Sequence, residues 1–367
     1  MRLPALAINF LLLFGFATSV RGENWPRFRG INGSGISGAK TVPVQWSDED
    51  YNWKIELAGS GLSSPVVWAN RLFVTSADAE AGNRYLYCVN TLDGSIAWRK
   101  VFTFSRHKKH KNNSFAANTP TVDADHVYVV WQSNERATLE ALTHAGKPVW
   151  TYDLGPFKGG HGPAGSPIVF EELVVFCNDH EGLSFLLGID RITGRQRWKV
   201  ARTGRRACYT TPCVFRSGGG VAQLIFTHSY QGITSVNPAS GEKNWEIMPF
   251  GTFKQRAIGS PIVAGGLVIG SSGFTTAERN VVAVRPTSDG SVMSVSEVYR
   301  VTKYAPHIPT PLAYRGLMFL WDDRGIVVCA ELETGKEVWV KRVGGTFYGS
   351  PICVDGKLYC ADRNGNV

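Results

Sequence analysis

The sequence predicts an all-β protein, a β-propeller built from four-stranded antiparallel blades. Two short phrases recur along the chain, one pairing glycine with tryptophan and one placing Ser/Thr-Pro before an apolar run. After the first 22 residues, no stretch shows helical periodicity over three turns. Self-similarity with a period of about 20–50 residues is typical of solenoids and propellers, so the spacing of the phrases decides the class.

The first phrase is a glycine followed four residues later by a tryptophan. Complete copies occur at Gly94/Trp98, Gly146/Trp150, Gly194/Trp198, Gly241/Trp245 and Gly335/Trp339, and an incomplete copy has Gly290 without a tryptophan. Successive glycines are 52, 48, 47, 49 and 45 residues apart. Four short strands fit within about 45–50 residues, which is the size of one propeller blade.

The second phrase is Ser/Thr-Pro followed by an apolar run, a turn and another apolar run. Its prolines are Pro65, Pro120, Pro167, Pro212, Pro261, Pro311 and Pro351. Short runs rich in Val, Ile, Phe and Tyr between Gly, Asn and Asp are strand and hairpin signals. Proline suits the first position of a strand, where no ladder donor is lost. Each unit therefore reads as four strands, with the glycine turn before the outermost one.

We expect the recurring tryptophans to hold neighbouring blades together. The glycine lets the chain reverse before the outermost strand, and the indole can then reach the next blade. A well-buried large aromatic stabilises a fold by roughly 1.5–3 kcal/mol or more. The residues predicted to have this structural role are Trp98, Trp150, Trp198, Trp245 and Trp339. Ligand binding by these side chains is the alternative.

The seventh unit lacks its Gly-x-x-x-Trp strand, and Trp53 in "YNWKIEL" precedes the first complete unit. We therefore expect an eight-bladed propeller that is truncated at its C-terminus in this chain, with a seven-bladed ring as the alternative. The strand around Trp53 is expected to complete the final blade. Truncation would leave unpaired strand edges.

Residues 1–22 have the layout of a secretory signal peptide: Arg2, an apolar stretch through Phe16, then small residues up to Gly22. An uncleaved anchor is the alternative. The expected organisation is a signal peptide, 1–22, and one propeller domain, 23–367. No later run of about 18 apolar residues predicts a membrane span. We expect export to the periplasm or the medium.

The formal net charge is +9, and the one dense cationic run is "RHKKHK", residues 106–111. Such a run could meet nucleic acid or an anionic membrane surface. No aromatic residue is interleaved for base stacking, so we expect a solvated loop and no nucleic-acid partner.

The seven cysteines are odd in number and include no CxxC pair, so they signal neither a zinc site nor a disulfide framework. We expect them to be small core residues. Bridges between Cys208 and Cys213, or between Cys353 and Cys360, are the alternative.

The phrase with Thr-Gly and a tryptophan at the fourth following position resembles the PQQ-like, quinoprotein-type β-propeller repeat. Asp190–Trp198 and Glu331–Trp339 match best, and the segment "ENWPRFRGINGSGIS" is similar to exported bacterial proteins with this repeat. WD40 and kelch patterns fit less well. The resemblance covers residues 23–367 and is specific for the fold, whereas function depends on individual sites.

Relatives of this kind include quinoprotein dehydrogenases, which bind pyrroloquinoline quinone and calcium, and BamB-type propellers, which bind other proteins. The dehydrogenases use adjacent cysteines, calcium ligands and an aspartate base. This sequence has no Cys-Cys pair and no acid-rich loop that offers several converging oxygens to calcium. We therefore expect no catalytic residue, no metal and no resident cofactor. The expected function is a monomeric, non-catalytic scaffold that binds a protein or ligand in the cell envelope, and the alternative is a PQQ-dependent oxidoreductase.

Residues just before each innermost strand are expected to surround the mouth of the central channel. They are Asn118, His161, Tyr209, Arg256, His307 and Tyr348. A pocket there is the default hypothesis for a binding site. The alternative is that these residues bind backbone groups and line a wet channel. Two histidines without a carboxylate partner are a weak signal for a metal.

Overall fold

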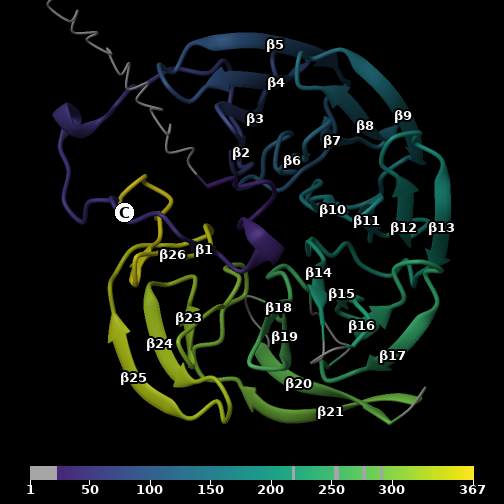
Figure 1. Cartoon of the computed structure of the whole chain (residues 1–367), viewed down its shortest axis with the longest axis vertical. Coiled ribbons are helices and arrows are strands. Elements are labelled where there is room, and N and C mark those ends of the chain that lie inside the picture. Colours follow the sequence, from purple (N-terminus) through teal and green to yellow (C-terminus); the bar gives the residue numbers. More distant parts are fainter. Residues whose placement is uncertain (1–22, 217–219, 252–255, 275–277, 290–291) are drawn as a thin grey trace, which may run out of the picture.

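The strands form seven sheets arranged around a ring (Figure 1). The computed structural model describes residues 23–216, 220–251, 256–274, 278–289 and 292–367. Six sheets have four antiparallel strands that are consecutive in the chain, and we call them blades 1 to 6. The remaining sheet, blade 7, has three strands. The predicted all-β propeller is confirmed, and the expected signal peptide lies outside the described residues.

The first three blades use strands β2 to β13. Blade 1 contains β2 (Val66–Trp68), β3 (Arg71–Asp78), β4 (Asn83–Asn90) and β5 (Ile96–Thr103). Blade 2 contains β6 (Thr121–Val122), β7 (His126–Gln132), β8 (Ala137–Thr143) and β9 (Pro148–Gly155). Blade 3 contains β10 (Ile168–Phe170), β11 (Leu173–Asn178), β12 (Phe185–Asp190) and β13 (Gln196–Ala201).

The other blades use the remaining strands. Blade 4 contains β14 (Cys213–Phe215), β15 (Gln223–His228), β16 (Gly232–Val236) and β17 (Lys243–Ile247). Blade 5 contains β18 (Ile262–Ala264), β19 (Leu267–Ser272), β20 (Asn280–Asp289) and β21 (Val292–Val301). Blade 6 contains β22 (Leu312–Tyr314), β23 (Leu317–Trp321), β24 (Ile326–Glu331) and β25 (Glu337–Arg342). Blade 7 contains β1 (Ile36–Ser37), β26 (Ile352–Val354) and β27 (Lys357–Tyr359).

The helical content of the described residues is limited to two short 3-10 turns, η1 (Ile31–Gly33) and η2 (Asp48–Asp50). No helix in these residues is both long and apolar enough to cross a bilayer. An eighth blade in a longer chain stays a prediction.

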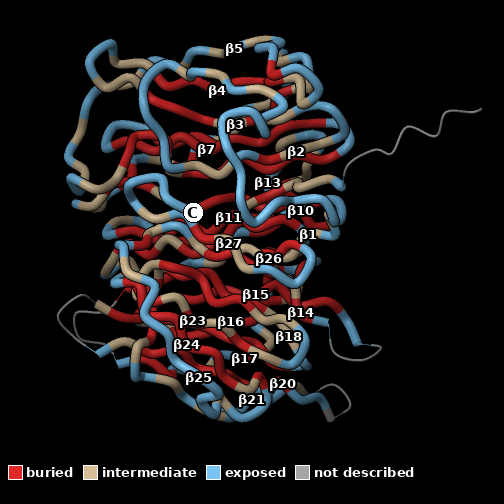
Figure 2. Tube along the Cα trace, turned by 90° about the vertical axis from the view of Figure 1, so that its left-hand side faces the viewer, coloured by how far each residue is buried: buried red, intermediate tan, exposed pale blue. Residues whose placement is uncertain are grey.

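The core lies between the faces of neighbouring blades. Every residue of β7 and β11 is buried, whereas exposed and half-buried residues alternate along β5 (Figure 2). Middle strands have a blade on either side, so both of their faces leave water and both favour apolar residues. Outer strands have one edge in solvent and keep the two-residue alternation.

Each innermost strand begins directly after the proline of its Ser/Thr-Pro phrase, as Val66 does after Pro65 and Ile352 does after Pro351. The glycine of the other phrase closes the hairpin before the outer strand. In blade 1, Gly94 has φ +72° and its N–H donates to the Asn90 carbonyl at 2.9 Å. This left-handed backbone is readily adopted only by glycine, which explains the fixed residue in the turn.

Aromatic side chains from one outer strand reach the glycine turn of the next blade. The indole N–H of Trp98 donates to the His144 carbonyl at 2.9 Å, beside Gly146. Trp150 donates to Arg191 at 3.0 Å, and Trp198 donates to Pro238 at 2.7 Å. These contacts join blades 1, 2, 3 and 4 in sequence.

The other copies of the phrase depart from this arrangement. Trp245 is buried, but its indole N–H donates to the Gln223 side chain of its own blade at 2.7 Å. The incomplete copy at Gly290 lies outside the described residues. In blade 5 the position is taken by Tyr299, whose hydroxyl donates to the Leu332 carbonyl at 2.6 Å. Trp339 is 42% exposed, so the expected docking of this indole is not made within the described chain.

The first blade receives its indole from Trp53, which donates to the Thr91 carbonyl at 2.8 Å and lies beside Gly94. Residues 51–57 form no strand, so they do not complete the final blade as expected. In blade 7, the strand from the N-terminal part of the chain is instead β1, which runs parallel to β26 with Ile36 opposite Cys353. The inner edge of β26 offers free backbone groups, and the extended segment after Gly35 satisfies them: the Cys353 N–H donates to the Gly35 carbonyl at 2.7 Å.

The segment of residues 24–37 lies in the middle of the ring (Figure 1). It pairs with blade 1 at Trp25–Val67, and Arg27 donates to the Pro212 carbonyl of blade 4 at 2.5 Å. Arg29 donates to the carbonyls of Pro351 at 2.6 Å and Pro311 at 3.1 Å. We call this segment the central plug, because it joins the inner strands of several blades in the middle of the ring.

All seven cysteines are buried and unpaired. The two alternative bridges named from the sequence are therefore not formed in this structure. Cys88 and Cys329 belong to the strand layer of the core, where a thiol behaves as a small apolar group.

Candidate functional site

The loops that lead into the innermost strands of blades 3 to 6 carry a cluster of polar side chains. The loops that enter the innermost strands bring together His161, Tyr209, Arg256 and His307, four of the six residues expected there. Two further residues join them, Arg206 and Phe274. We call these six residues the mouth cluster.

Arg256 lies at the centre of the mouth cluster and is only 6% exposed. Its backbone forms a β-bridge with Gly273, and its Nη1 donates to the Ala207 carbonyl at 3.0 Å. Its Nη2 lies 3.3 Å from Nδ1 of His161. Because guanidinium only donates, this imidazole nitrogen accepts and the His161 proton resides on Nε2.

Phe274 separates two other members of the mouth cluster. The guanidinium carbon of Arg206 lies 5.7 Å from the centroid of the Phe274 ring. The His307 ring meets the same phenyl group edge-on, with the centroids 6.2 Å apart. The backbone N–H of His307 donates to Asp323 Oδ2 at 2.9 Å, which fixes the loop that carries the imidazole.

Tyr209 enters the mouth cluster from blade 4. Its backbone N–H donates to the Ala257 carbonyl at 2.9 Å, so it is fixed to the loop that carries Arg256. Its hydroxyl oxygen is buried and has no hydrogen-bond partner. Burial raises the pKa of this phenol to about 12, so it stays protonated and is a donor at neutral pH.

Both histidines of the mouth cluster are held neutral at physiological pH. Burial, reinforced by the positive charge of Arg256, lowers the pKa of His161 to about 4. Burial also lowers the pKa of His307 to about 4, and Arg279 and Arg256 add to the effect. The charged groups of the cluster are therefore the two guanidinium groups, while the imidazoles and the phenol are neutral.

The basic segment, residues 106–111, lies across the mouth cluster. The ring of His110 stacks on that of His161 with centroids 5.2 Å apart, and the backbone N–H of His110 donates to the His161 carbonyl at 3.2 Å. Farther along the same loop, Asn112 donates to the Tyr348 hydroxyl of the final blade at 3.1 Å. The basic segment is therefore anchored near its C-terminal end, while its cations Arg106, Lys108 and Lys111 are exposed, as expected for a solvated loop.

Asn118 and Tyr348 lie apart from the mouth cluster. Asn118 is 2% exposed and donates to Gln132 Oε1 at 3.2 Å and to the Gly165 carbonyl. It therefore satisfies groups in the wall between blades 2 and 3, as the structural alternative expects. Tyr348 supports the basic segment through Asn112.

A buried polar cluster lies behind Tyr209 and was not signalled by any sequence motif. Arg202 donates to Asp179 Oδ2 at 3.2 Å, and the thiol of Cys177 donates to the same oxygen at 2.9 Å. Cys208 lies 3.4 Å from the Ser229 hydroxyl, with His228 nearby. Cys208 is 5% exposed and His228 is fully buried, so this thiol is not placed to attack a substrate.

The donor set of the mouth cluster does not fit calcium. Ca²⁺ takes six to eight oxygen ligands, many of them carboxylates, whereas the cluster presents guanidinium, imidazole and one phenol. Two carboxylates close to His307, those of Asp322 and Asp323, are paired with Arg279 at 3.2 and 2.9 Å. Across the described ranges, no group of three or more His, Cys, Asp or Glu residues could hold a metal ion. No reaction step through a calcium–quinone pair follows from this site.

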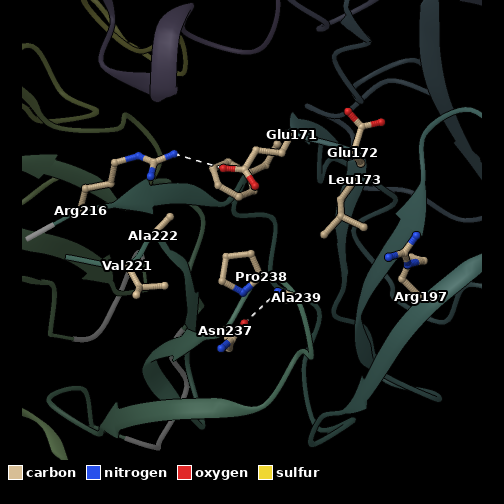
Figure 3. Close-up of a pocket in the computed structure, with 11 residues that line it drawn as sticks. Glu171, Glu172, Leu173, Arg197, Arg216, Val221, Ala222, Asn237, Pro238 and Ala239 are labelled. Atoms are coloured by element: carbon tan, nitrogen blue, oxygen red, sulfur yellow. Dashed lines mark hydrogen bonds and ion pairs between the residues drawn. The ribbon is translucent and has the colours of Figure 1, made fainter. Parts of the chain in front are cut away.

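A hollow of about 450 Å³ lies between blades 3 and 4, beside the turns that follow their inner strands (Figure 3). Its lining includes the apolar Leu173 and Ala222 and four charged side chains, those of Glu171, Glu172, Arg197 and Arg216. Arg216 pairs with Glu171 at 3.5 Å, and both are exposed. Exposed ion pairs contribute little to binding or stability, so the mouth cluster is the stronger candidate.

Comparisons with known proteins support the fold and span several activities. A family model described as "Outer membrane protein assembly factor BamB" matches residues 44–296 and 277–367. The structure of BamB from Moraxella catarrhalis has a TM-score of 0.56 at 16% identity, covering 81% of this chain and 78% of that one. A quinohemoprotein alcohol dehydrogenase from Pseudomonas putida HK5 has a TM-score of 0.58 at 13% identity, covering 91% and 75%.

A curated relative is the tetrathionate hydrolase of Acidithiobacillus ferrooxidans. It is 26% identical over 236 residues, which are 59% of this chain and 42% of the relative. The chain therefore spans less than half the length of this relative.

Proposed function

Because the chain belongs to the family described as the outer membrane protein assembly factor BamB, we propose that it is a non-catalytic propeller scaffold that binds an acidic protein partner in the cell envelope. Family membership supports the scaffold role. Export and location in the envelope belong to the same proposal.

One observation carries the proposal: the basic segment is anchored over the mouth cluster and presents its cations outward. The His110 stack on His161 and the hydrogen bonds of Asn113 to the His161 carbonyl at 2.8 Å and the Pro163 carbonyl at 3.1 Å hold the backbone in place. A fixed loop loses less conformational entropy on binding than a free one. Arg106, Lys108 and Lys111 then give an acidic partner a complementary field, which raises the association rate and the specificity.

A photo-crosslinking residue at position 108, compared with one at Lys336 on the outer hairpin of blade 6, tests the proposal. Both lysines are exposed, so reagent access is matched. We expect a discrete acidic protein to crosslink at position 108 in intact cells, and the crosslink to weaken in a Lys111→Glu background. Equal crosslinking at both positions would contradict the proposal.

The alternative is a quinone-dependent oxidoreductase, which the shared fold with the quinohemoprotein alcohol dehydrogenase favours. It is tested by adding pyrroloquinoline quinone and Ca²⁺ to the purified protein and measuring the bound-quinone spectrum and alcohol-dependent dye reduction. We expect neither signal. A tetrathionate turnover assay tests the activity of the curated relative in the same preparation.

Export is tested by sequencing the N-terminus of the protein recovered from a periplasmic fraction. We expect the mature chain to begin near Glu23. A chain that retains its first residues and stays with the membrane would support the uncleaved anchor instead.

A further inference from the structure

The mouth cluster contains four buried donor atoms that have no hydrogen-bond partner among the described residues. They are Arg256 Nε, Arg206 Nη1, the Tyr209 hydroxyl and His307 Nε2. Buried polar groups in folded proteins are nearly always paired, and an exception calls for an explanation such as an absent ion. Four such atoms in one cluster point to a common acceptor.

Contacts between the side chains and loops place these donors around one region. Tyr209 is fixed to the loop of Arg256 through Ala257, and Arg256 is fixed to the Gly273 backbone, next to Phe274. Arg206 and His307 both pack against the Phe274 ring. The donors therefore come from consecutive blades and are linked through a single phenyl ring and two backbone contacts.

The local charge is positive and is not neutralised by the surrounding carboxylates. Asp323 accepts from Arg279 and from the backbone N–H groups of His307 and Ile308. Asp322 pairs with Arg279 and Arg324. Glu181 is an exposed carboxylate near Tyr209. Arg206 and Arg256 have no carboxylate partner in the described chain, and Lys108 adds a further cation above His161.

We propose that the mouth cluster is a binding site for a small oxyanion, a sulfate-, phosphate- or carboxylate-type group held by Arg256, Arg206, Tyr209 and His307. Charged and neutral donors would converge on its oxygens, and hydrogen bonds to an ionised acceptor are stronger than neutral ones. This site does not depend on the protein partner proposed above.

The oxyanion could be a free ion or the acidic side chain of a partner, because the two present the same oxygens. Inorganic sulfate is the probe for the free ion, and a Glu-rich peptide is the probe for a partner's side chain. Chloride at equal ionic strength controls for general screening of the basic surface.

The test is isothermal titration of sulfate into the full chain, together with thermal unfolding in sulfate and in chloride. We expect saturable binding and a higher Tm in sulfate than in chloride. Tyr209→Phe and Arg206→Gln should each weaken binding by about tenfold or more, because each removes a donor to a charged group. Arg195→Gln on the exposed outer hairpin of blade 3 removes the same charge and should leave binding unchanged.

Tyr209→Phe separates binding from folding. Its hydroxyl has no partner, so without sulfate the variant should be as stable as the wild type or more stable. NMR titration of the histidines adds a second readout, because a bound anion should raise the pKa of His161 and His307. Equal sulfate affinities for Tyr209→Phe, Arg206→Gln and the wild type would overturn the proposal, as would equal stabilisation by chloride.

The peptide arm identifies the source of the anion. Displacement of sulfate by the Glu-rich peptide would assign the site to a partner's carboxylate, and saturable sulfate binding without displacement would assign it to a free ion. Loss of the Lys108 crosslink with retained sulfate binding would reject the scaffold function while leaving the oxyanion site standing.

Discussion

The indole of Trp198 covers Gly241 of the next blade and donates its N–H to Pro238 at 2.7 Å. Trp198 is 5% exposed, so one side chain supplies both apolar contact and a hydrogen bond to a neighbouring turn. The same arrangement recurs between earlier blades, which explains why glycine and tryptophan are spaced as a unit in the sequence.

Replacing Trp198 by alanine should destabilise the fold by about 3–5 kcal/mol, because a buried aromatic is lost and a cavity remains between blades. Trp339→Ala is the matched control, since that indole is 42% exposed. Its loss should be about 1 kcal/mol or less. Urea unfolding followed by circular dichroism measures both, and equal losses would contradict the docking role.

A methyl group at Gly241 should be more destabilising than one at Gly316. Both glycines have positive φ, +75° and +76°, so alanine is strained at each by about 1–2 kcal/mol. At Gly241 the added Cβ would also lie 2.8 Å from the Trp198 ring, whereas nothing lies within 4 Å at Gly316. We expect Gly241→Ala to lose about 1–3 kcal/mol more than Gly316→Ala in the same unfolding assay.

Arg29 should be essential to the attachment of the central plug. It is 3% exposed and donates to carbonyls of two inner strands, at Pro311 and Pro351. Arg29→Met should lose about 3 kcal/mol or more, because hydrogen bonds from a charged donor vanish and buried carbonyls are left unpaired. Arg29→Lys should rescue only part of the loss, since ammonium lacks the planar fork. Arg195→Met, at an exposed site, is the control. An equally large loss of unfolding free energy in this control would contradict the role of Arg29 in attaching the central plug.

Stability should fall as the pH is lowered from about 6.5 to about 4, in part through the mouth histidines. His161 and His307 have folded pKa values of about 4, so between these limits the unfolded chain binds more protons than the folded one. By linkage, the free energy of unfolding then rises with pH through this window. Burial is the main reason why both imidazoles resist protonation. The positive charges of Arg256, Arg206 and Lys108, together with His110, add to this effect at His161, and those of Arg279 and Arg256 add to it at His307.

Replacing both histidines by asparagine should flatten this part of the pH profile relative to the wild type. Unfolding measured at pH 4.5 and pH 7 gives the comparison. A wild-type slope retained in the double variant would assign the acid sensitivity to other groups.

The repeat and the blade order could be predicted from the sequence because each depends on neighbours in the chain. Pro65 directly precedes its strand and Gly94 closes its turn through local backbone preferences, and the proline recurs in all seven units. Tyr299 shows the limit of pattern matching: it takes the position of an indole in blade 5, and a search for tryptophan passes over it.

The central plug and part of the mouth cluster could not be predicted in this way. Arg27 binds a carbonyl 185 residues away and Arg29 binds one 322 residues away, so neither has a local signal. Their positions just before inner strands identified His161 and Arg256 as residues of the channel mouth. Arg206 and Phe274 join the mouth cluster only because of the way their loops fold, which the sequence pattern does not show. Asn118 also precedes an inner strand, but its side chain binds groups between blades 2 and 3 and does not join the mouth cluster.

The central plug also imposes an order of assembly. Arg29 of the central plug binds carbonyls at Pro311 and Pro351, which are synthesised 282 and 322 residues later. Contacts between such distant residues slow folding, because a long loop must close before they form. The central plug therefore reaches its final position only after the chain has been synthesised through Pro351, so closure of the ring is a late step that requires this proline.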